Sequence, residues 1–249
     1  MSTNRIWIWY MHGNRAFILS VAALFTAFLF FELSDVDLLV ESWFYSETTQ
    51  TWLLDRENQL ARLLFYDGIK GVLSLFVFGL IGTLLIFGKR PFVQRYKEGM
   101  KVVILSMILI PLTVSSLKAV TNVPCPKNIT CFHGTTPYVK VLDSYPEGYQ
   151  QKSRCRCYPA GHASGGFALL SLYFLFQNSR NRRRALAAAL ALGWTMGLYK
   201  MLIGDHFLSH TVVTMLLAWI MVQAIARYVY RPRSEEPLMI TNPKEYNAA

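Results

Sequence analysis

Residues 16–33 read AFILSVAALFTAFLFFEL and carry one charged side chain, Glu32. A helix needs about 20 mostly apolar residues to cross a bilayer, so this stretch predicts a transmembrane helix. Five more apolar stretches follow it, at about residues 71–88, 102–117, 160–177, 185–203 and 211–230. We therefore predict an all-α integral membrane bundle of six transmembrane helices.

The composition of the whole chain agrees with a membrane protein. Of its 249 residues, 53% are hydrophobic and 16% are charged, whereas a soluble domain carries about a quarter charged residues. The net charge of +10 is concentrated in short segments between or after apolar stretches, which is typical of topology signals and not of nucleic-acid binding. We expect membrane lipids as partners and no nucleic acid.

Three basic segments predict the orientation of the chain. They are GKRPFVQRYKEGMK at residues 88–101, NSRNRRRA at 178–185 and RYVYRPR at 227–233. Short loops rich in Lys and Arg stay in the cytoplasm, so both termini should be cytoplasmic. We expect a membrane domain over residues 1–233 and a disordered cytoplasmic tail over 234–249.

Unusual polar residues collect at the predicted outer ends of the apolar stretches. Ionisable groups at membrane depth are costly and usually functional. CYPAGHASGGF, at residues 157–167, precedes one apolar stretch, and YKMLIGDHFLSH, at 199–210, joins two others. The ionisable side chains in question are Lys118, His162, Lys200, Asp205, His206 and His210.

These side chains suit chemistry on a phosphate. His206 and His210 are four residues apart and would share one face of a helix. A histidine can attack phosphorus when a second group fixes its tautomer, and another, here His162, can protonate a leaving alkoxide. Lys118 and Lys200 can neutralise phosphate oxygens. We therefore predict an outward-facing phosphoryl-transfer site, with no cofactor and no metal.

Three short motifs carry a resemblance to a known family. They are Lys118-x6-Cys125-Pro126, Pro159-Ala160-Gly161-His162 and Tyr199-Lys200-x5-His206-x3-His210. In order and position they resemble the type 2 phosphatidic acid phosphatase superfamily, whose motifs are Lys-x6-Arg-Pro, Pro-Ser-Gly-His and Ser-Arg-x5-His-x3-Asp. This chain departs from that pattern at Cys125, Ala160, Lys200 and His210.

The resemblance implies a role for each matching residue. His206 would be the nucleophile that forms a phosphohistidine, His162 the acid, and His210 the residue in place of the orienting Asp. The phosphate would be held by Lys118, Lys200, Ala160 and Gly161. Lys200 offers a point charge where the family has the bidentate fork of Arg.

The resemblance also implies a lipid phosphatase of the bacterial inner membrane with a site facing the periplasm. Candidate substrates are undecaprenyl diphosphate, phosphatidylglycerol phosphate, phosphatidic acid and a lipid A phosphate. One alternative is a phosphotransferase, and another is an inactive protein that binds or transports lipid. A third is a metal protein that uses Asp205, His206 and His210, which the neighbouring lysines disfavour.

All four cysteines fall in the predicted outer loop, residues 118–158. An even set on the outer side of a membrane predicts two disulfides. Cys155 and Cys157 are too close in sequence to bond without strain, so each should pair with Cys125 or Cys131. We expect Cys125–Cys157, which would hold the first motif against the second, together with Cys131–Cys155. The crossed pairing is the alternative.

Overall fold

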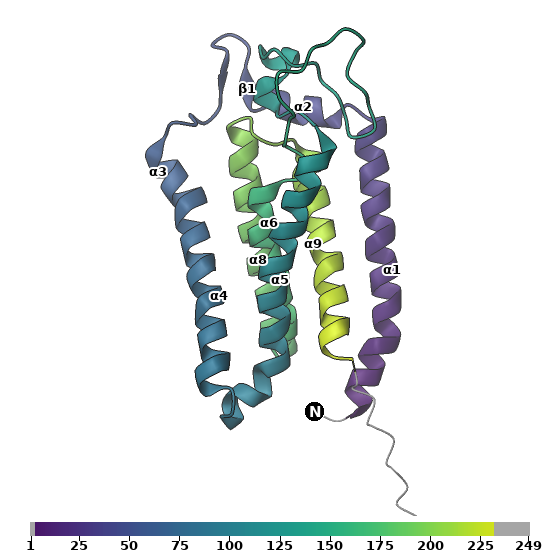
Figure 1. Cartoon of the computed structure of the whole chain (residues 1–249), viewed down its shortest axis with the longest axis vertical. Coiled ribbons are helices and arrows are strands. Elements are labelled where there is room, and N and C mark those ends of the chain that lie inside the picture. The colour runs from purple at the N-terminus through teal and green to yellow at the C-terminus, as the bar shows by residue number, and fades with distance from the viewer. Residues whose placement is uncertain (1–2, 232–249) are drawn as a thin grey trace, which may run out of the picture.

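Long helices run side by side through the computed structural model, which describes residues 3–231, with side chains from residue 14 onward (Figure 1). Five helices are long and apolar enough to cross a membrane among these residues. They lie in α1 (Thr3–Leu33), in α4 (Gly68–Phe87) with the turn before it, in α5 (Pro91–Thr121), in α8 (Ser179–Leu202) and in α9 (Leu208–Val229). The predicted tail, residues 234–249, lies outside the described part of the chain.

The fourth predicted span differs from the expectation. It forms three short consecutive pieces, α6 (Gly161–Ala168), a 3-10 turn (Leu169–Ser171) and α7 (Leu172–Leu175). Glycines dilute its apolar character, but its side chains are largely buried among α5, α8 and α9. A Cβ on Gly166 would lie 2.7 Å from the Gly193 Cα, so glycine lets α6 approach α8 closely. The sequence predicts six spans, whereas five helices among the described residues are long and apolar enough to cross a membrane.

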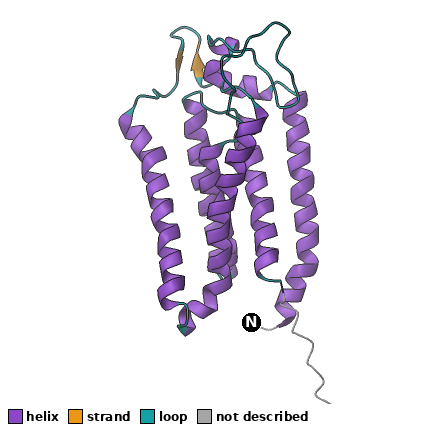
Figure 2. Cartoon of the chain, viewed as in Figure 1, coloured by secondary structure: helices purple, strands orange, loops and turns teal. Residues whose placement is uncertain are grey.

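The two ends of the bundle differ in structure. The start of α1, the turn between α4 and α5 and the end of α9 lie at the lower end in Figure 1. The first basic segment, residues 88–101, contacts the residue just before the second, because the Arg95 side chain donates to the Gln177 side chain at 2.9 Å. The opposite end is covered by loops and small elements (Figure 2). These are α2 (Val36–Ser42), β1 (Tyr45–Ser46), β2 (Thr51–Trp52), α3 (Gln59–Arg62) and 3-10 turns at Pro126–Asn128 and Thr130–Phe132.

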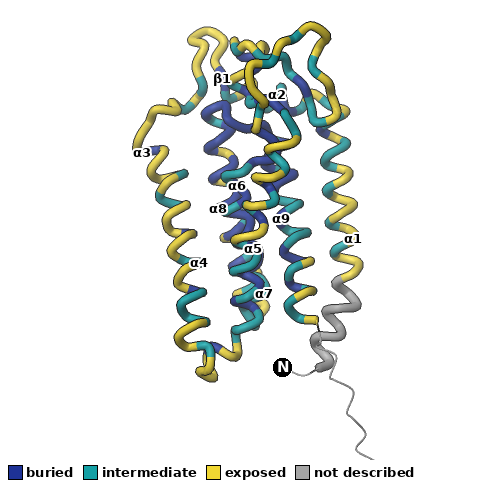
Figure 3. Tube along the Cα trace, in the orientation of Figure 1, coloured by how far each residue is buried: buried dark blue, intermediate teal, exposed yellow. Residues whose placement is uncertain are grey.

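Burial divides the bundle into a centre and a periphery (Figure 3). α5, α6, α8 and α9 supply most of the buried core, with Ile110, Phe167 and Val222 fully enclosed. α1 and α4 expose large apolar side chains such as Ile18 and Leu75. Apolar residues on the outside of a helix bundle are those expected to contact lipid chains. The buried centre is therefore the part of the bundle that can hold polar chemistry away from lipid.

Helix α2 buries two carboxyl groups beneath the outer cap. Asp37 and Glu41 lie one helical turn apart, with 5% and 0% of their surface exposed. Neither oxygen of the Glu41 carboxyl has a hydrogen-bond partner among the described residues. Burial, and secondarily the charge of Asp37, raises the pKa of Glu41 to about 10. Glu41 is therefore protonated at neutral pH.

This raised pKa predicts a dependence of stability on pH. Between pH 4.5 and about 10, folded Glu41 holds a proton that the unfolded chain releases, so stability falls as pH rises through that window. The loss is about 1.4 kcal/mol per pH unit at most. We expect Glu41→Gln, which cannot ionise, to unfold at a higher temperature than wild type at pH 8. The difference should shrink toward pH 5 in thermal unfolding of the detergent-solubilised protein. An equal difference at both pH values would contradict the assignment.

Candidate active site

The polar centre of the bundle contains two histidines in contact. His206 lies in the turn between α8 and α9, and His210 lies in the first turn of α9. Their Nδ1 atoms are 3.3 Å apart, and both side chains are buried. Burial, followed by the electrostatic influence of His210 and Lys118, lowers the pKa of His206 well below its usual range. His206 is therefore neutral at physiological pH, as a nucleophile must be.

The turn that carries His206 is fixed by its backbone. Gly204 adopts a φ of 70°, the left-handed conformation that glycine reaches without strain. The amides of Asp205 and His206 then both donate to the Lys200 carbonyl, at 2.8 Å and 3.3 Å. The Gly204 carbonyl in turn accepts from the Lys127 amide at 3.0 Å. The end of α8 is thus closed back on itself, and His206 is directed into the bundle.

The surroundings of His210 suggest the proton arrangement of the pair. The backbone carbonyl of Cys157 lies close to the His210 ring and can accept a proton from it. We assign that proton to the His210 Nε2, because the His210 Nδ1 faces His206, and this Nδ1 then remains an acceptor. His206 must then donate from Nδ1, which leaves a lone pair on its Nε2. Because the structure shows no protons, this tautomer is assigned from the network of partners.

Two more of the predicted residues approach this pair from other helices. The ring of His162, at the start of α6, lies 6.1 Å from the His206 ring and 4.7 Å from the Tyr66 ring, centroid to centroid. Lys118, in the last turn of α5, places its Nζ 3.4 Å from where a Cβ on Gly161 would stand. Glycine at position 161 thus lets the lysine pass close to the start of α6. The structure brings Lys118, Gly161, His162 and His206 together.

Ala160 was predicted to help hold the phosphate, but its backbone has other partners in the structure. Its amide donates to the Thr214 hydroxyl at 2.8 Å and lies 3.2 Å from the His210 carbonyl oxygen. Ala160 is fully buried, so this amide joins α6 to α9 and is not available to a substrate. It still contributes to the site indirectly, because it fixes the backbone of the turn that carries His210.

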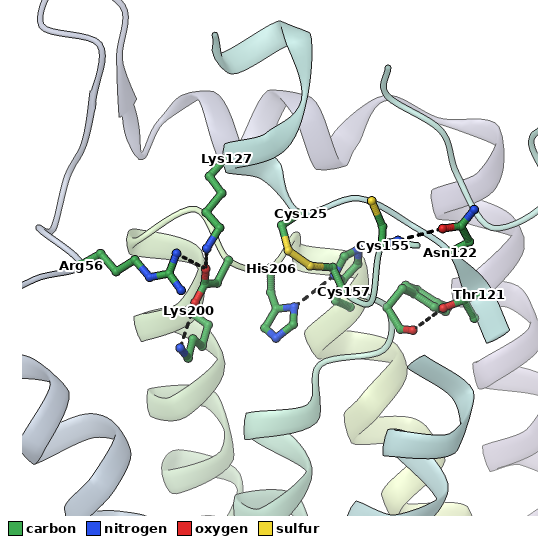
Figure 4. The surroundings of a disulfide bond; sticks show 12 residues. Arg56, Thr121, Asn122, Cys125, Lys127, Cys155, Cys157, Lys200 and His206 are labelled. Carbon is green, nitrogen blue, oxygen red and sulfur yellow. Dashed lines mark hydrogen bonds and ion pairs between the residues drawn. A yellow bond between two sulfur atoms is a disulfide. The ribbon is translucent and has the colours of Figure 1, made fainter. Parts of the chain in front are cut away.

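A cluster of charges adjoins His206 on the outer side (Figure 4). The Asp205 carboxylate accepts from Lys200 at 2.9 Å and from Lys127 at 2.6 Å, with Arg56 at 3.9 Å. Burial acts to raise the pKa of Asp205, but the charges and hydrogen bonds of the two lysines outweigh it, so the net direction is down. Asp205 therefore stays ionised and holds Lys200 beside the histidines.

Sequence reasoning missed two of these cations. The family motif has an Arg at the position of Cys125, and Lys127 lies two residues after it. A cation so close to that position is a signal that could have been noticed. Arg56 carries no comparable signal, because it comes from a loop far from every motif. Asp205 was a possible metal ligand in one alternative, but it bonds lysines. Among the described residues, no three His, Cys, Asp or Glu side chains gather as a metal site would require.

Two cavities meet at His162 and Tyr66. The larger, about 510 Å³, lies between α4, α5 and α6 and is lined mainly by apolar side chains such as Leu73, Phe78 and Met107. It reaches Lys118 and Gly161 at one end. The smaller, about 240 Å³, is polar and is lined by several charged side chains. Those charged residues are Arg56, Glu57, Arg62, Lys200 and Asp205. The site therefore joins an apolar compartment to a charged one.

One of the two expected disulfides is present. Cys125 and Cys157 are bonded, and the Cys157 amide donates to the Val123 carbonyl at 3.2 Å. Cys131 and Cys155 are free thiols, which corrects the prediction of a second bond. The Cys155 amide is tied to the Asn122 side chain, whereas Cys131 sits exposed on a 3-10 turn. The two thiols therefore occupy separate surroundings.

Comparison with known proteins identifies the family of this chain. The family model of the PAP2 superfamily matches residues 100–234, which is more than half of the chain. The protein therefore belongs to the PAP2 superfamily, whose members are phosphatases. Searches of curated proteins and of solved structures gave no match. The family match supports a lipid phosphate hydrolase of the phosphatase type.

The disulfide and the carbonyl of Cys157 predict a redox effect on activity. The bond joins residues with a sequence separation of 32, so its loss lowers the stability of the fold by about 3 to 4 kcal/mol in the chain-entropy account. Its loss also releases the backbone of Cys157, whose carbonyl lies close to His210. We expect Cys125→Ser to lower kcat about tenfold or more while the protein still inserts into membranes. Cys131→Ser, which alters a free exposed thiol, is the matched control and should keep wild-type kcat. Phosphate release by the wild type and by both variants, measured with and without reductant, checks these expected values of kcat. Full activity of Cys125→Ser would contradict this role.

Proposed function

We propose that this protein is a metal-independent phosphatase that removes a phosphate group from a membrane lipid through a phosphohistidine at His206. The observation that carries the proposal is the neutral, buried His206, whose Nδ1 faces His210 and whose ring lies 6.1 Å from His162. A nucleophile, a base that orients it and a separate acid are the parts that covalent phosphoryl transfer needs.

In the first half of the reaction, His206 Nε2 attacks phosphorus and the bond from phosphorus to the lipid oxygen breaks. His162 gives a proton to that leaving oxygen, so the lipid departs as an alcohol or a monophosphate. Burial and the charges of Lys200 and Lys118 lower the pKa of His162 to about 3 in the free protein, so His162 takes up this proton together with the negatively charged substrate. The positive charge that develops on the His206 ring is stabilised through its Nδ1 proton, which His210 accepts. A neutral His210 stabilises this charge less than a carboxylate would.

In the second half, water attacks phosphorus and the bond to His206 breaks. His162, now neutral, takes a proton from the water, and inorganic phosphate leaves. The charged cavity lined by Arg56, Lys200 and Asp205 offers water a path to the site. The same acid and base thus serve both halves, as microscopic reversibility requires.

Lys118 and Lys200 supply positive charge for the phosphate oxygens. Lys118 lies beside Gly161 at the end of the apolar cavity, and Lys200 lies on the charged side. Lys200 bonds Asp205 in the structure, so a bound phosphate would share this lysine with the carboxylate. Lysine side chains carry the charge that metal ions supply in other phosphatases, which favours metal-independent turnover.

The apolar cavity supports a lipid substrate with a long chain. About 510 Å³ of space between α4, α5 and α6 ends at Lys118 and His162, so a chain can lie there with its phosphate at the histidines. The candidates are those named above: undecaprenyl diphosphate, phosphatidylglycerol phosphate, phosphatidic acid and a lipid A phosphate. We place the protein in the bacterial inner membrane with the site toward the periplasm, a proposal supported by the basic segments at the opposite end of the bundle.

A phosphate-release screen over these four lipids in detergent tests the proposal. We expect release from at least one of them, unchanged by chelator and inhibited by vanadate. His206→Ala should lose about three or more powers of ten in kcat, because only binding and charge stabilisation remain. His133→Ala, a half-exposed histidine of the outer cap that bonds Tyr45, is the matched control and should keep activity.

Three outcomes would overturn the proposal. Full activity in His206→Ala would remove the phosphohistidine. Loss of activity in chelator with recovery on adding metal would remove metal independence. Binding of a lipid phosphate without any phosphate release would favour an inactive lipid-binding protein.

A further inference from the structure

The start of α9 is not capped by its own sequence. Its N-cap residue is Phe207, whose side chain can accept no hydrogen bond, although the first amides of a helix need acceptors. The Ser209 amide donates instead to the Asp37 carboxylate at 2.8 Å. Asp37 lies in α2, 172 positions earlier in the chain, and both residues are 5% exposed. A buried carboxylate from a distant helix therefore caps α9.

The capped turn is the one that carries the catalytic pair. His206 precedes α9 by two residues, and His210 follows Ser209 directly. The contact between the two Nδ1 atoms depends on where this turn sits, and a shift of about 1 Å in a catalytic group can lower a rate a hundredfold. α2 lies outside residues 100–234, so the family's shared sequence does not supply this cap.

We propose that Asp37 is a positioning residue for the reaction, and that its ionised carboxylate holds the first turn of α9 so that His206 and His210 stay aligned. This inference rests on the proposed function for its kinetic consequences. The hydrogen bond and the burial that carry it stand independently of the substrate.

The charge of Asp37 can be titrated in the physiological range. Burial raises its pKa to about 6, although the Ser209 hydrogen bonds and Lys140 oppose the rise. A carboxylate at a helix N-terminus makes a charge-assisted bond and meets the positive end of the helix dipole, and both effects weaken when it gains a proton. The titratable groups around Asp37 are Glu32 of α1, Glu41 of α2, Tyr138, Lys140 and Tyr158 of the outer loop, and His210 of α9.

Two substitutions separate the charge of Asp37 from its hydrogen bond. Asp37→Asn keeps an acceptor oxygen but has no charge at any pH. Asp37→Leu removes the acceptor while keeping a similar size. Glu41→Gln is the matched control, because Glu41 is buried one turn away on the same helix, is uncharged, and has no hydrogen-bond partner among the described residues.

We expect wild-type kcat to fall as pH drops through about 6, with KM little changed. Asp37→Asn should lack this step: its kcat should be severalfold below wild type at pH 8 and equal to it at pH 5. Asp37→Leu should lose about tenfold to a hundredfold at every pH, and Glu41→Gln should follow the wild-type profile. His206 does not obscure the step, because its own pKa is lowered well below 6.5.

Hydrogen exchange of the peptide spanning residues 207–211 gives a readout that does not depend on activity. Its amides should exchange faster in Asp37→Leu than in wild type or Glu41→Gln. Wild-type kcat in Asp37→Leu, or the same acid step in Asp37→Asn, would overturn the inference while leaving the proposed function intact. If wild type releases no phosphate, the proposed function fails and the exchange rates alone decide: unchanged exchange in Asp37→Leu overturns the cap.

Discussion

The contact between the Nδ1 atoms of His206 and His210 is the interaction on which the rest of the site depends. The two rings are buried where water cannot fix their protons, so their partners must do so. The Cys157 carbonyl lies close to the His210 ring, and with the His210 proton assigned toward it, His206 presents a free Nε2. The disulfide at Cys157 and the carboxylate of Asp37 act on this contact from two sides. Elements far apart in sequence therefore help to hold the two histidines in the same arrangement.

Burial of charge is the second constraint. The chain encloses Lys200 and Asp205 together, and Lys127 and Arg56 add positive charge on the outer side. Ionised groups can be buried only when they are paired, and this cluster satisfies that condition without placing a carboxylate against the histidines. Lys127 and Arg56 also supply positive charge of the kind that the family motifs carry on arginines. Lys127 reaches the cluster from a turn beside Cys125, whose own side chain is committed to the disulfide.

The sequence predicted the features that depend on local pattern. Long apolar runs identified the helices that now form α1, α4, α5, α8 and α9, and three motifs identified the residues that converge around His206. The Cys125–Cys157 bond was also foreseen. The fourth span was harder, because α6 is buried within the bundle and needs small residues, not apolar ones, to approach α8.

Features set by tertiary contact escaped sequence reasoning. Asp37 and Arg56 reach the site from segments without a motif, so only the fold reveals them. The Ala160 amide was assigned to the substrate, but it is used by α9. Cys131 and Cys155 were paired by counting, but both are free thiols: the Cys155 amide donates to the Asn122 side chain, and Cys131 is exposed on a 3-10 turn. In each case the deciding interaction joins residues many positions apart.

The most direct measurement is to trap the covalent intermediate. Brief reaction with a lipid substrate whose transferable phosphate is radiolabelled, an alkaline quench and peptide mapping would locate the label. The account predicts a phosphoryl group on His206 that survives base and is lost in acid. A label on His162 or on a carboxylate, or rapid phosphate release with no covalent label, would contradict it.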